Sequence, residues 1–115
     1  MVMTQLWDSP TALINVGGDL EDLKELLLLM LEQAPDLIAD IASAIQENNP
    51  AKLYLAAHTL KSSLQLLGFD ASGEIASALE LAGRTQQIES CDDLLLRLQM
   101  TTDLTIVLIR DYISS

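Results

Sequence analysis

The chain has 115 residues and a formal net charge of −11, and half of its residues are hydrophobic although only 3% are aromatic. A chain of this length fits one domain, 1–115, around one core. The charge argues against nucleic acid, because a phosphate backbone selects basic surfaces, and it also disfavours anionic membranes. The longest apolar run is far too short to span a bilayer, and the N-terminus does not resemble a signal peptide.

Histidine and cysteine each occur once, which limits the disulfides and metal sites that the chain could form. Cys91 has no possible partner for an internal disulfide, so we expect a reducing, cytoplasmic compartment. One histidine and one cysteine cannot build a structural zinc site. No glycine-rich phosphate loop is present either, so we do not expect the chain to bind ATP.

Leucine, isoleucine and alanine supply most apolar residues, which favours helices over a β-sandwich or barrel. In chain order, caps and apolar stripes predict helices at roughly 10–16, 19–34, 35–48, 50–67, 71–86 and 92–113.

A few residues that start or end helices define the expected helix boundaries. Ser9 is expected to cap the first helix, and Asp19 the second. Pro35 should kink the second helix or start a new one. Asn49-Pro50 predicts the cap and first residue of the central helix, and Gly68 is placed to terminate it.

The segment 92–113 allows two interpretations. Apolar residues in it keep helical spacing, but Thr101–Val107 is rich in β-branched residues and could be a strand. A lone strand after a series of helices would have no partner, so we predict a helix. The whole pattern predicts an all-α fold, an antiparallel up-down four-helix bundle with a short extra N-terminal helix.

The central helix carries His58, the only side chain that titrates near neutral pH. Its apolar residues form one narrow stripe, made of Leu53, Ala56, Leu60, Leu64 and Leu67. His58 points to the opposite side, where its helical neighbours are Tyr54, Lys61, Ser62 and Gln65. A histidine placed to pack in the core would lie among the leucines.

A neutral imidazole on a solvated helix face can attack an incoming phosphoryl group. Lys61, one turn on, could offset the negative charge of the phosphoryl oxygens. Glu80, on the next helix, is a candidate acceptor that would fix the tautomer of the ring. The plainer alternatives are a solvated histidine, a solubilising lysine, and a Glu80 that pairs with Arg84 one turn on.

Four residues of the central helix form a candidate partner-binding surface. Ser62 is small and leaves room for a partner to approach, and Gln65 lies on the same face. Leu55 and Leu66 flank this face and could form an apolar rim for docking. Both leucines could equally be core residues against a neighbouring helix.

The chain resembles the histidine phosphotransfer (Hpt) domain family of two-component phosphorelays. The similarity covers most of the chain, and its motifs are Ala57-His58-Thr59-Leu60-Lys61-Ser62-Ser63, then Leu67-Gly68, then Leu79-Glu80. The resemblance implies that His58 carries a phosphoryl group on Nε2, that Lys61 assists, and that Glu80 hydrogen-bonds the other ring nitrogen. Two residues depart from the usual pattern: Ser62 replaces the commoner glycine, and Ser72 replaces an apolar residue.

The resemblance also implies partners. The chain would be a phosphocarrier rather than an enzyme, exchanging the group with an aspartate of a response-regulator receiver domain or a hybrid histidine kinase. It would need no cofactor, because Mg²⁺ would sit on the receiver.

Two other functions remain open for this fold. One is a helical interaction module that is not phosphorylated, and the other is the phosphoacceptor domain of a chemotaxis-type histidine kinase. Because the chain starts at Met1 and stops just after the last predicted helix, we expect a free-standing protein. We also expect a monomer.

Overall fold

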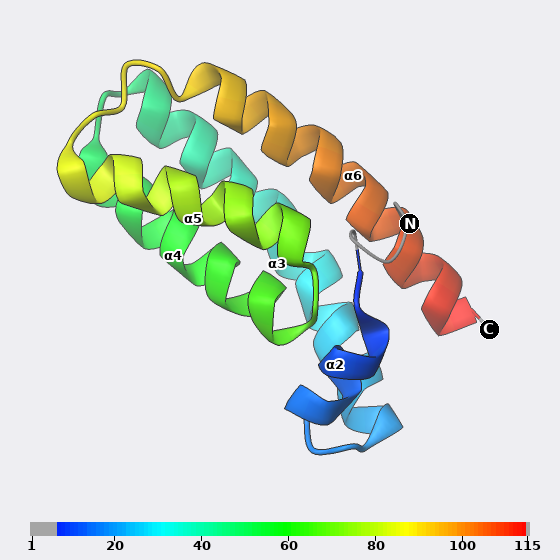
Figure 1. Cartoon of the computed structure of the whole chain (residues 1–115). Coiled ribbons are helices and arrows are strands. Elements are labelled where there is room, and N and C mark those ends of the chain that lie inside the picture. Colours follow the sequence, from blue (N-terminus) through cyan, green and yellow to red (C-terminus); the bar gives the residue numbers. More distant parts are fainter. Residues whose placement is uncertain (1–6, 115) are drawn as a thin grey trace.

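The computed structural model describes residues 7–114, and over this range it is all-helical, with no strand. Its helices, labelled as in Figure 1, are α2 (Ser9–Asn15), α3 (Leu20–Gln46), α4 (Pro50–Leu66), α5 (Asp70–Thr85) and α6 (Asp92–Ser114). The prediction of an all-α chain is therefore confirmed for the described residues, including a helix rather than a strand in the last segment. None of these helices is long and apolar enough to cross a membrane.

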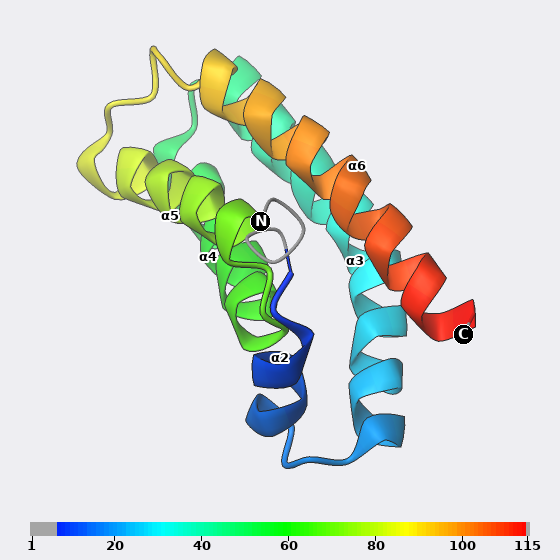
Figure 2. The same cartoon turned by 45° about the vertical axis from the view of Figure 1, so that its right-hand side comes forward.

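The four long helices pack against one another around a shared core. The most extensive packing is between α4 and α5, which lie side by side in both views (Figures 1 and 2). Helix α3 packs against α4 and α6, and α6 also contacts α5. The colour gradient shows that the chain direction reverses from each of these helices to the next, and that α2 lies at the end where α3 begins and α4 stops.

The stripe predicted for the central helix is the part of α4 that enters the core. Its members Leu53, Ala56, Leu60, Leu64 and Leu67 are all buried. At one end of the core, the ring of Trp7 stacks on buried Phe69 with 5.1 Å between ring centroids, and meets the ring of Tyr112 edge-on. This aromatic cluster joins the start of the described chain to both α6 and the turn after α4.

The predicted start of a new helix at Pro35 is wrong, because Leu20–Gln46 is one continuous α-helix with Pro35 inside it. Proline costs a helix the hydrogen bond that its missing N–H would donate. Pro35 itself is exposed, whereas Ala34 and Ile41 on either side of it are buried in the core. The apolar stripe therefore continues across the proline, and its packing against the other helices stabilises α3 on both sides of Pro35.

The helix caps agree with the sequence at two of the three predicted positions. Asp19 accepts hydrogen bonds from the first turn of α3, and Asn49 accepts one from the first turn of α4. The cap of α2 is Asp8 rather than Ser9, and its carboxylate accepts from the Thr11 N–H at 3.1 Å. The Asp8 N–H donates to the carbonyl of Gly68 at 2.8 Å, and this long-range bond holds Asp8 just outside the helix.

Gly68 follows the end of α4 and has a left-handed φ of +81°. A Cβ at this position would lie 2.4 Å from the carbonyl oxygen of Asp8. A glycine is therefore needed both to end α4 and to let the start of the described chain cross the turn closely.

Ser72, the departure from the usual apolar residue, is fully buried in α5. Its hydroxyl lies 3.3 Å from the hydroxyl of Thr105 on α6, which also donates to the Thr101 carbonyl. A buried hydroxyl with a partner is tolerated in a core, so Ser72 does not interrupt the packing of α5 on α6.

Candidate functional site

His58 lies on the outer side of α4, and half of its side chain is exposed. This placement follows from the register of the helix. Asn49 caps α4 and Pro50 is its first residue, and from there the leucine stripe turns inward and His58 turns outward. The ring is thus open to solvent while the helix beneath it is fixed by the core.

Glu80 on α5 is almost completely buried and binds two side chains of α4. One carboxylate oxygen contacts Nδ1 of His58, and the other accepts a hydrogen bond of 2.6 Å from Nζ of Lys61. The Lys61 hydrogen bond holds the pKa of Glu80 below its ordinary value, against the effect of burial, and the His58 contact lowers it further. Glu80 is therefore a carboxylate in the folded protein near neutral pH.

The ionised state of Glu80 fixes the tautomer of His58. A carboxylate can only accept hydrogen bonds, so Nδ1 must be the nitrogen that donates. In a neutral imidazole the other nitrogen, Nε2, then carries a free lone pair. In this tautomer, Nε2 is the ring nitrogen whose lone pair could attack an electrophile.

Gly83 explains how a residue of α5 reaches across to α4. A Cβ at position 83 would lie 2.7 Å from the backbone nitrogen of Tyr54 and 2.9 Å from the carbonyl oxygen of Pro50. Only a glycine permits this close approach of two helix backbones. The approach occurs one turn from Glu80, and it brings that carboxylate within reach of His58.

A stacking contact between two rings and a contact between a cation and a ring complete the site. Helical spacing predicted that the first two residues would be neighbours, but it did not predict the second contact. The ring of Tyr54 stacks on the imidazole of His58, with 5.7 Å between centroids and 10° between planes. The guanidinium of Arg84 lies over the Tyr54 ring and 3.9 Å from Glu80. The four-residue spacing placed Tyr54 near His58, but the stacking and the Arg84–Tyr54 contact were missed.

The sequence suggested either His58 or Arg84 as the partner of Glu80, and in the structure Glu80 contacts both residues. The close contacts are with His58 and Lys61, whereas the distance of 3.9 Å to Arg84 is that of a weak, largely exposed ion pair. Lys61 thus contacts the carboxylate that holds His58, and its side chain is only about one-fifth exposed.

The four residues of the candidate partner-binding surface all lie exposed on α4. The alternative that Leu55 and Leu66 are core residues is wrong, because they are 64% and 42% exposed. Ser62 donates to the carbonyl of His58 at 3.0 Å, so its small side chain folds back on the helix. Together with Gln65, these side chains leave the approach to His58 open.

Glu80→Gln is expected to destabilise the fold at pH 7 by about 1–3 kcal/mol, because a neutral amide replaces a carboxylate with two charge-assisted hydrogen bonds. The pKa of Glu80 is lower in the folded protein than its ordinary value of 4.5. The stability that its ionisation contributes should therefore be complete above about pH 5 and should decline as the pH falls through the lower folded pKa. Urea unfolding of both proteins between about pH 3 and 7 measures this. A stability difference that stays constant over this range would contradict the ionised bridge.

No group of three or more histidine, cysteine, aspartate or glutamate side chains within residues 7–114 could hold a metal ion. The site combines an imidazole nitrogen of His58, the carboxylate of Glu80 behind the ring and the ammonium group of Lys61 beside it. These groups are components that phosphoryl transfer uses.

Comparison with known proteins identifies the family. The Hpt domain family matches residues 25–108, which is most of the chain and includes His58, Lys61 and Glu80. No curated protein and no solved structure matches the chain. The match confirms the resemblance noted in the sequence, and the chain belongs to the histidine phosphotransfer (Hpt) domain family.

Proposed function

We propose that His58 accepts a phosphoryl group on Nε2 from an aspartate of a response-regulator receiver domain, and donates it back to such an aspartate. Hpt domains are phosphocarriers of two-component signalling and interact with receiver domains. The observation that carries the residue assignment is the contact between Nδ1 of His58 and the buried, ionised Glu80. In a neutral ring this contact leaves the lone pair on Nε2, and half of the side chain is exposed. Within this proposal, α3 to α6 form the antiparallel up-down four-helix bundle predicted from the sequence.

The transfer step can be written with its atoms in balance. The Nε2 lone pair of His58 forms the N–P bond while the bond from phosphorus to the partner's aspartate oxygen breaks, and that carboxylate keeps the electron pair. The ring becomes cationic, and its Nδ1 proton remains on the hydrogen bond to Glu80, which stabilises the positive charge. The reverse transfer follows the same path.

Lys61 has a separate role in this proposal. In the resting protein its ammonium group neutralises Glu80. When a phosphoryl group arrives, the same flexible side chain can turn toward the phosphoryl oxygens, while the cationic ring takes over as the partner of Glu80. The negative charge of Glu80 is then compensated both before and after transfer.

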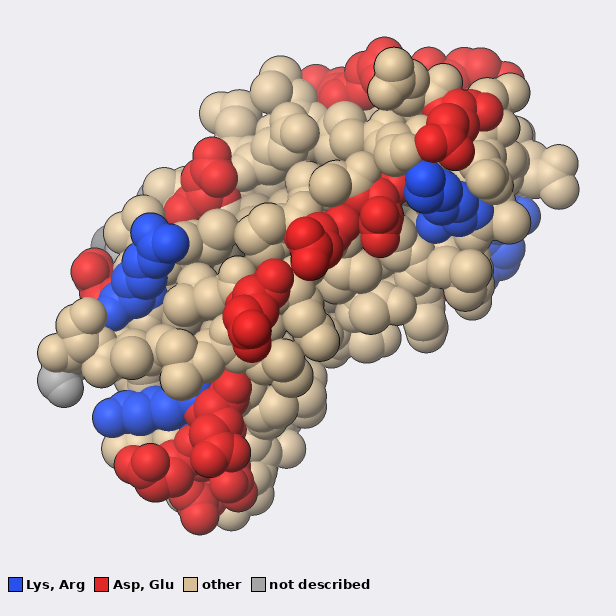
Figure 3. All heavy atoms as spheres, turned by 180° about the vertical axis from the view of Figure 1, so that it is seen from behind, with Lys and Arg blue, Asp and Glu red and all other residues tan. Residues whose placement is uncertain are grey.

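Docking must overcome the overall charge of −11, because the active site of a receiver is itself acidic. Acidic side chains outnumber basic ones over the face in Figure 3. We therefore assign docking to the less acidic surface around His58 and Lys61, with Leu55, Ser62, Gln65 and Leu66 as its contacts. The chain acts as a monomeric, cytoplasmic carrier without an ATP site of its own, and the receiver supplies Mg²⁺.

The direct test is transfer of label from candidate receiver domains that have been phosphorylated on their aspartate with acetyl phosphate and Mg²⁺. A matching receiver should lose its label to this chain within minutes, and the new bond should be labile in acid and stable in base. If no receiver transfers label although one binds the chain tightly, the alternative of an unphosphorylated interaction module gains.

Ser62→Arg is expected to slow this transfer by at least about tenfold, because a long side chain next to His58 blocks the in-line approach of the partner's aspartate. Ser90→Arg is the matched control, since it adds the same charge to an exposed loop away from the site. Circular dichroism should show both variants folded. Transfer to Ser62→Arg at the wild-type rate would mean that the partner does not approach across this face of α4.

A further inference from the structure

Tyr54 lies one helical turn before His58 on α4, and the face of its ring meets two side chains of the site. The ring stacks on the imidazole of His58, with 5.7 Å between centroids and 10° between planes. Nearly parallel rings at this separation are offset, which is an arrangement that aromatic pairs prefer. The guanidinium carbon of Arg84 lies over the same ring, 5.9 Å from its centroid. Tyr54 therefore contacts the ring that reacts, although the transfer described above assigns it no role.

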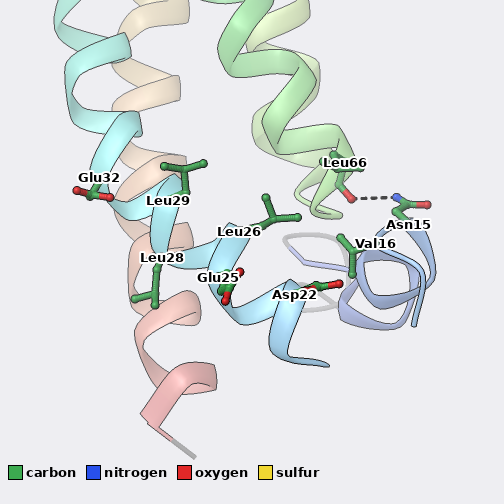
Figure 4. Close-up of a pocket in the computed structure, with 9 residues that line it drawn as sticks. All are labelled: Asn15, Val16, Asp22, Glu25, Leu26, Leu28, Leu29, Glu32 and Leu66. Atoms are coloured by element: carbon green, nitrogen blue, oxygen red, sulfur yellow. Dashed lines mark hydrogen bonds between the residues drawn. The ribbon is translucent and has the colours of Figure 1, made fainter. Parts of the chain in front are cut away.

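The backbone of α4 is held at both of its ends by contacts that do not involve Tyr54. A side-chain cap holds the first turn. At the other end, the side-chain amide of Asn15 on α2 donates to the carbonyl of Leu66 at 2.9 Å (Figure 4). The direction of the half-exposed imidazole of His58 therefore depends on contacts of the side chain itself. Glu80 holds Nδ1 of the imidazole, and Tyr54 packs against the plane of the ring.

The ring of Tyr54 is in place before any phosphoryl group arrives. The backbone nitrogen of Tyr54 lies at a close approach of α4 and α5, where a Cβ on Gly83 would be only 2.7 Å away. Tyr54 is partly buried, and the next residue of α5, Arg84, lies over its ring. His58 therefore stacks on a surface that other contacts already hold, and little further conformational freedom is lost.

The charges of the site explain why a neutral ring is suited to this position. Phosphorylation on Nε2 makes the imidazole cationic, and the cations of Lys61 and Arg84, which lie 2.6 Å and 3.9 Å from the Glu80 carboxylate, oppose this charge. A second carboxylate beside the imidazole would favour its positive charge, but it would also repel the phosphoryl oxygens and an acidic receiver. The face of a tyrosine ring has no net charge, yet it attracts a cation within about 6 Å. Tyr54 can therefore stabilise the cationic imidazole without repelling the incoming group.

The effect of this stack on transfer depends on how its strength changes with the charge of His58. A contact shifts an equilibrium only by the difference between its strengths in the two states. Before transfer the stack joins two neutral rings, and after transfer the face of Tyr54 also attracts a cationic ring. For a partly exposed pair, the added attraction corresponds to about a twofold to fivefold shift in the equilibrium constant.

We propose that Tyr54 is a positioning residue that acts through His58, and that its ring favours the phosphorylated, cationic imidazole over the neutral one. The proposal rests on the phosphoryl transfer proposed above. Tyr54 takes no part in the bond changes: the N–P bond forms at Nε2, the bond from phosphorus to the partner's aspartate oxygen breaks, and no proton moves to or from the tyrosine.

The test measures the equilibrium of transfer between the full chain and a labelled receiver, as the ratio of label on the chain to label on the receiver. Tyr54→Leu should lower this ratio by about twofold to fivefold, because an aliphatic side chain has no face that attracts a cation. Tyr54→Phe keeps the ring and should leave the ratio within about 1.5-fold of the wild-type value. Nuclear Overhauser contacts between the rings at positions 54 and 58 should be present in the wild-type chain and in Tyr54→Phe.

Tyr112→Leu is the matched control, since it removes an equally partly buried tyrosine that meets another ring, that of Trp7, at the end of the core. It should change the ratio by less than about 1.5-fold, although it removes a packing contact. Circular dichroism checks that each variant is folded, and Tyr54→Met replaces Tyr54→Leu if the latter is not.

An equilibrium ratio separates stabilisation of the cationic ring from damage to docking or to the fold. A docking defect slows transfer in both directions and leaves the ratio unchanged, so that result for Tyr54→Leu would overturn the proposal. Equal losses in Tyr54→Leu and Tyr54→Phe, or in Tyr112→Leu, would overturn it too, as would the absence of contacts between the rings. In these cases the wild-type chain still accepts label, and the proposed function stands. A wild-type chain that no receiver labels would overturn both.

Discussion

His58→Gln is expected to abolish phosphoryl transfer to this chain while the helical fold remains. The variant lacks the ring nitrogen that would form the N–P bond, and no other histidine exists in the sequence. Half of the His58 side chain is exposed, so its replacement should cost no more than about 1–2 kcal/mol of unfolding free energy, mainly from the contact with Glu80. Incubation with a labelled receiver, followed by gel autoradiography, measures the transfer.

Two controls make the result of this substitution specific. The receiver must remain labelled in the presence of the variant, and the thermal unfolding of the variant must stay cooperative. Acid-labile, base-stable label on His58→Gln would show that another residue of the chain accepts the group and would remove His58 from the mechanism.

Gly83→Ala is expected to have the second largest effect, because it forces two helix backbones apart. The added methyl group would lie 2.7 Å from the backbone nitrogen of Tyr54 and 2.9 Å from the carbonyl oxygen of Pro50, and neither atom can move without the helix. Overpacking of this kind costs about 1–3 kcal/mol of unfolding free energy. Displacement of α5 should also separate Glu80 from His58 and slow transfer.

Gly73→Ala in the same helix is the matched control. A Cβ there would lie 3.1 Å from Cγ of Gln65, a flexible side chain that can turn away. Since alanine favours a helix over glycine by about 0.8–1 kcal/mol, Gly73→Ala should be neutral or stabilising. Equal effects of both substitutions in urea unfolding would show that the contact at Gly83 does not set the distance between α4 and α5.

The parts of the fold that depend on local chemistry could be predicted from the sequence. Asn49 and the leucine stripe define α4 from within one segment, and both are found as expected. The failures involve contacts between distant segments. Pro35 does not interrupt α3 because other helices pack on both sides of it, and Asp8 rather than Ser9 caps α2 because Gly68 holds it in place.

The same distinction applies to the site. The positions of His58 and Lys61 on one helix follow from their spacing, whereas the approach of Glu80 requires knowledge of how α5 lies on α4. From the sequence, Glu80 was only a candidate acceptor on the next helix, and the family resemblance implied the same role. Gly83, which permits the approach, gives no signal in a single sequence, because a glycine within a helix only lowers its predicted stability.

The most direct test of the central claim is NMR of the phosphorylated chain, labelled with ¹⁵N in its single histidine. The account predicts that phosphorus is coupled to Nε2 of His58 while Nδ1 keeps its proton in the hydrogen bond to Glu80. Before phosphorylation, the nitrogen shifts of the neutral form of the ring should place its proton on Nδ1. Coupling of phosphorus to Nδ1, or a phosphoryl group on any residue other than His58, would contradict the account.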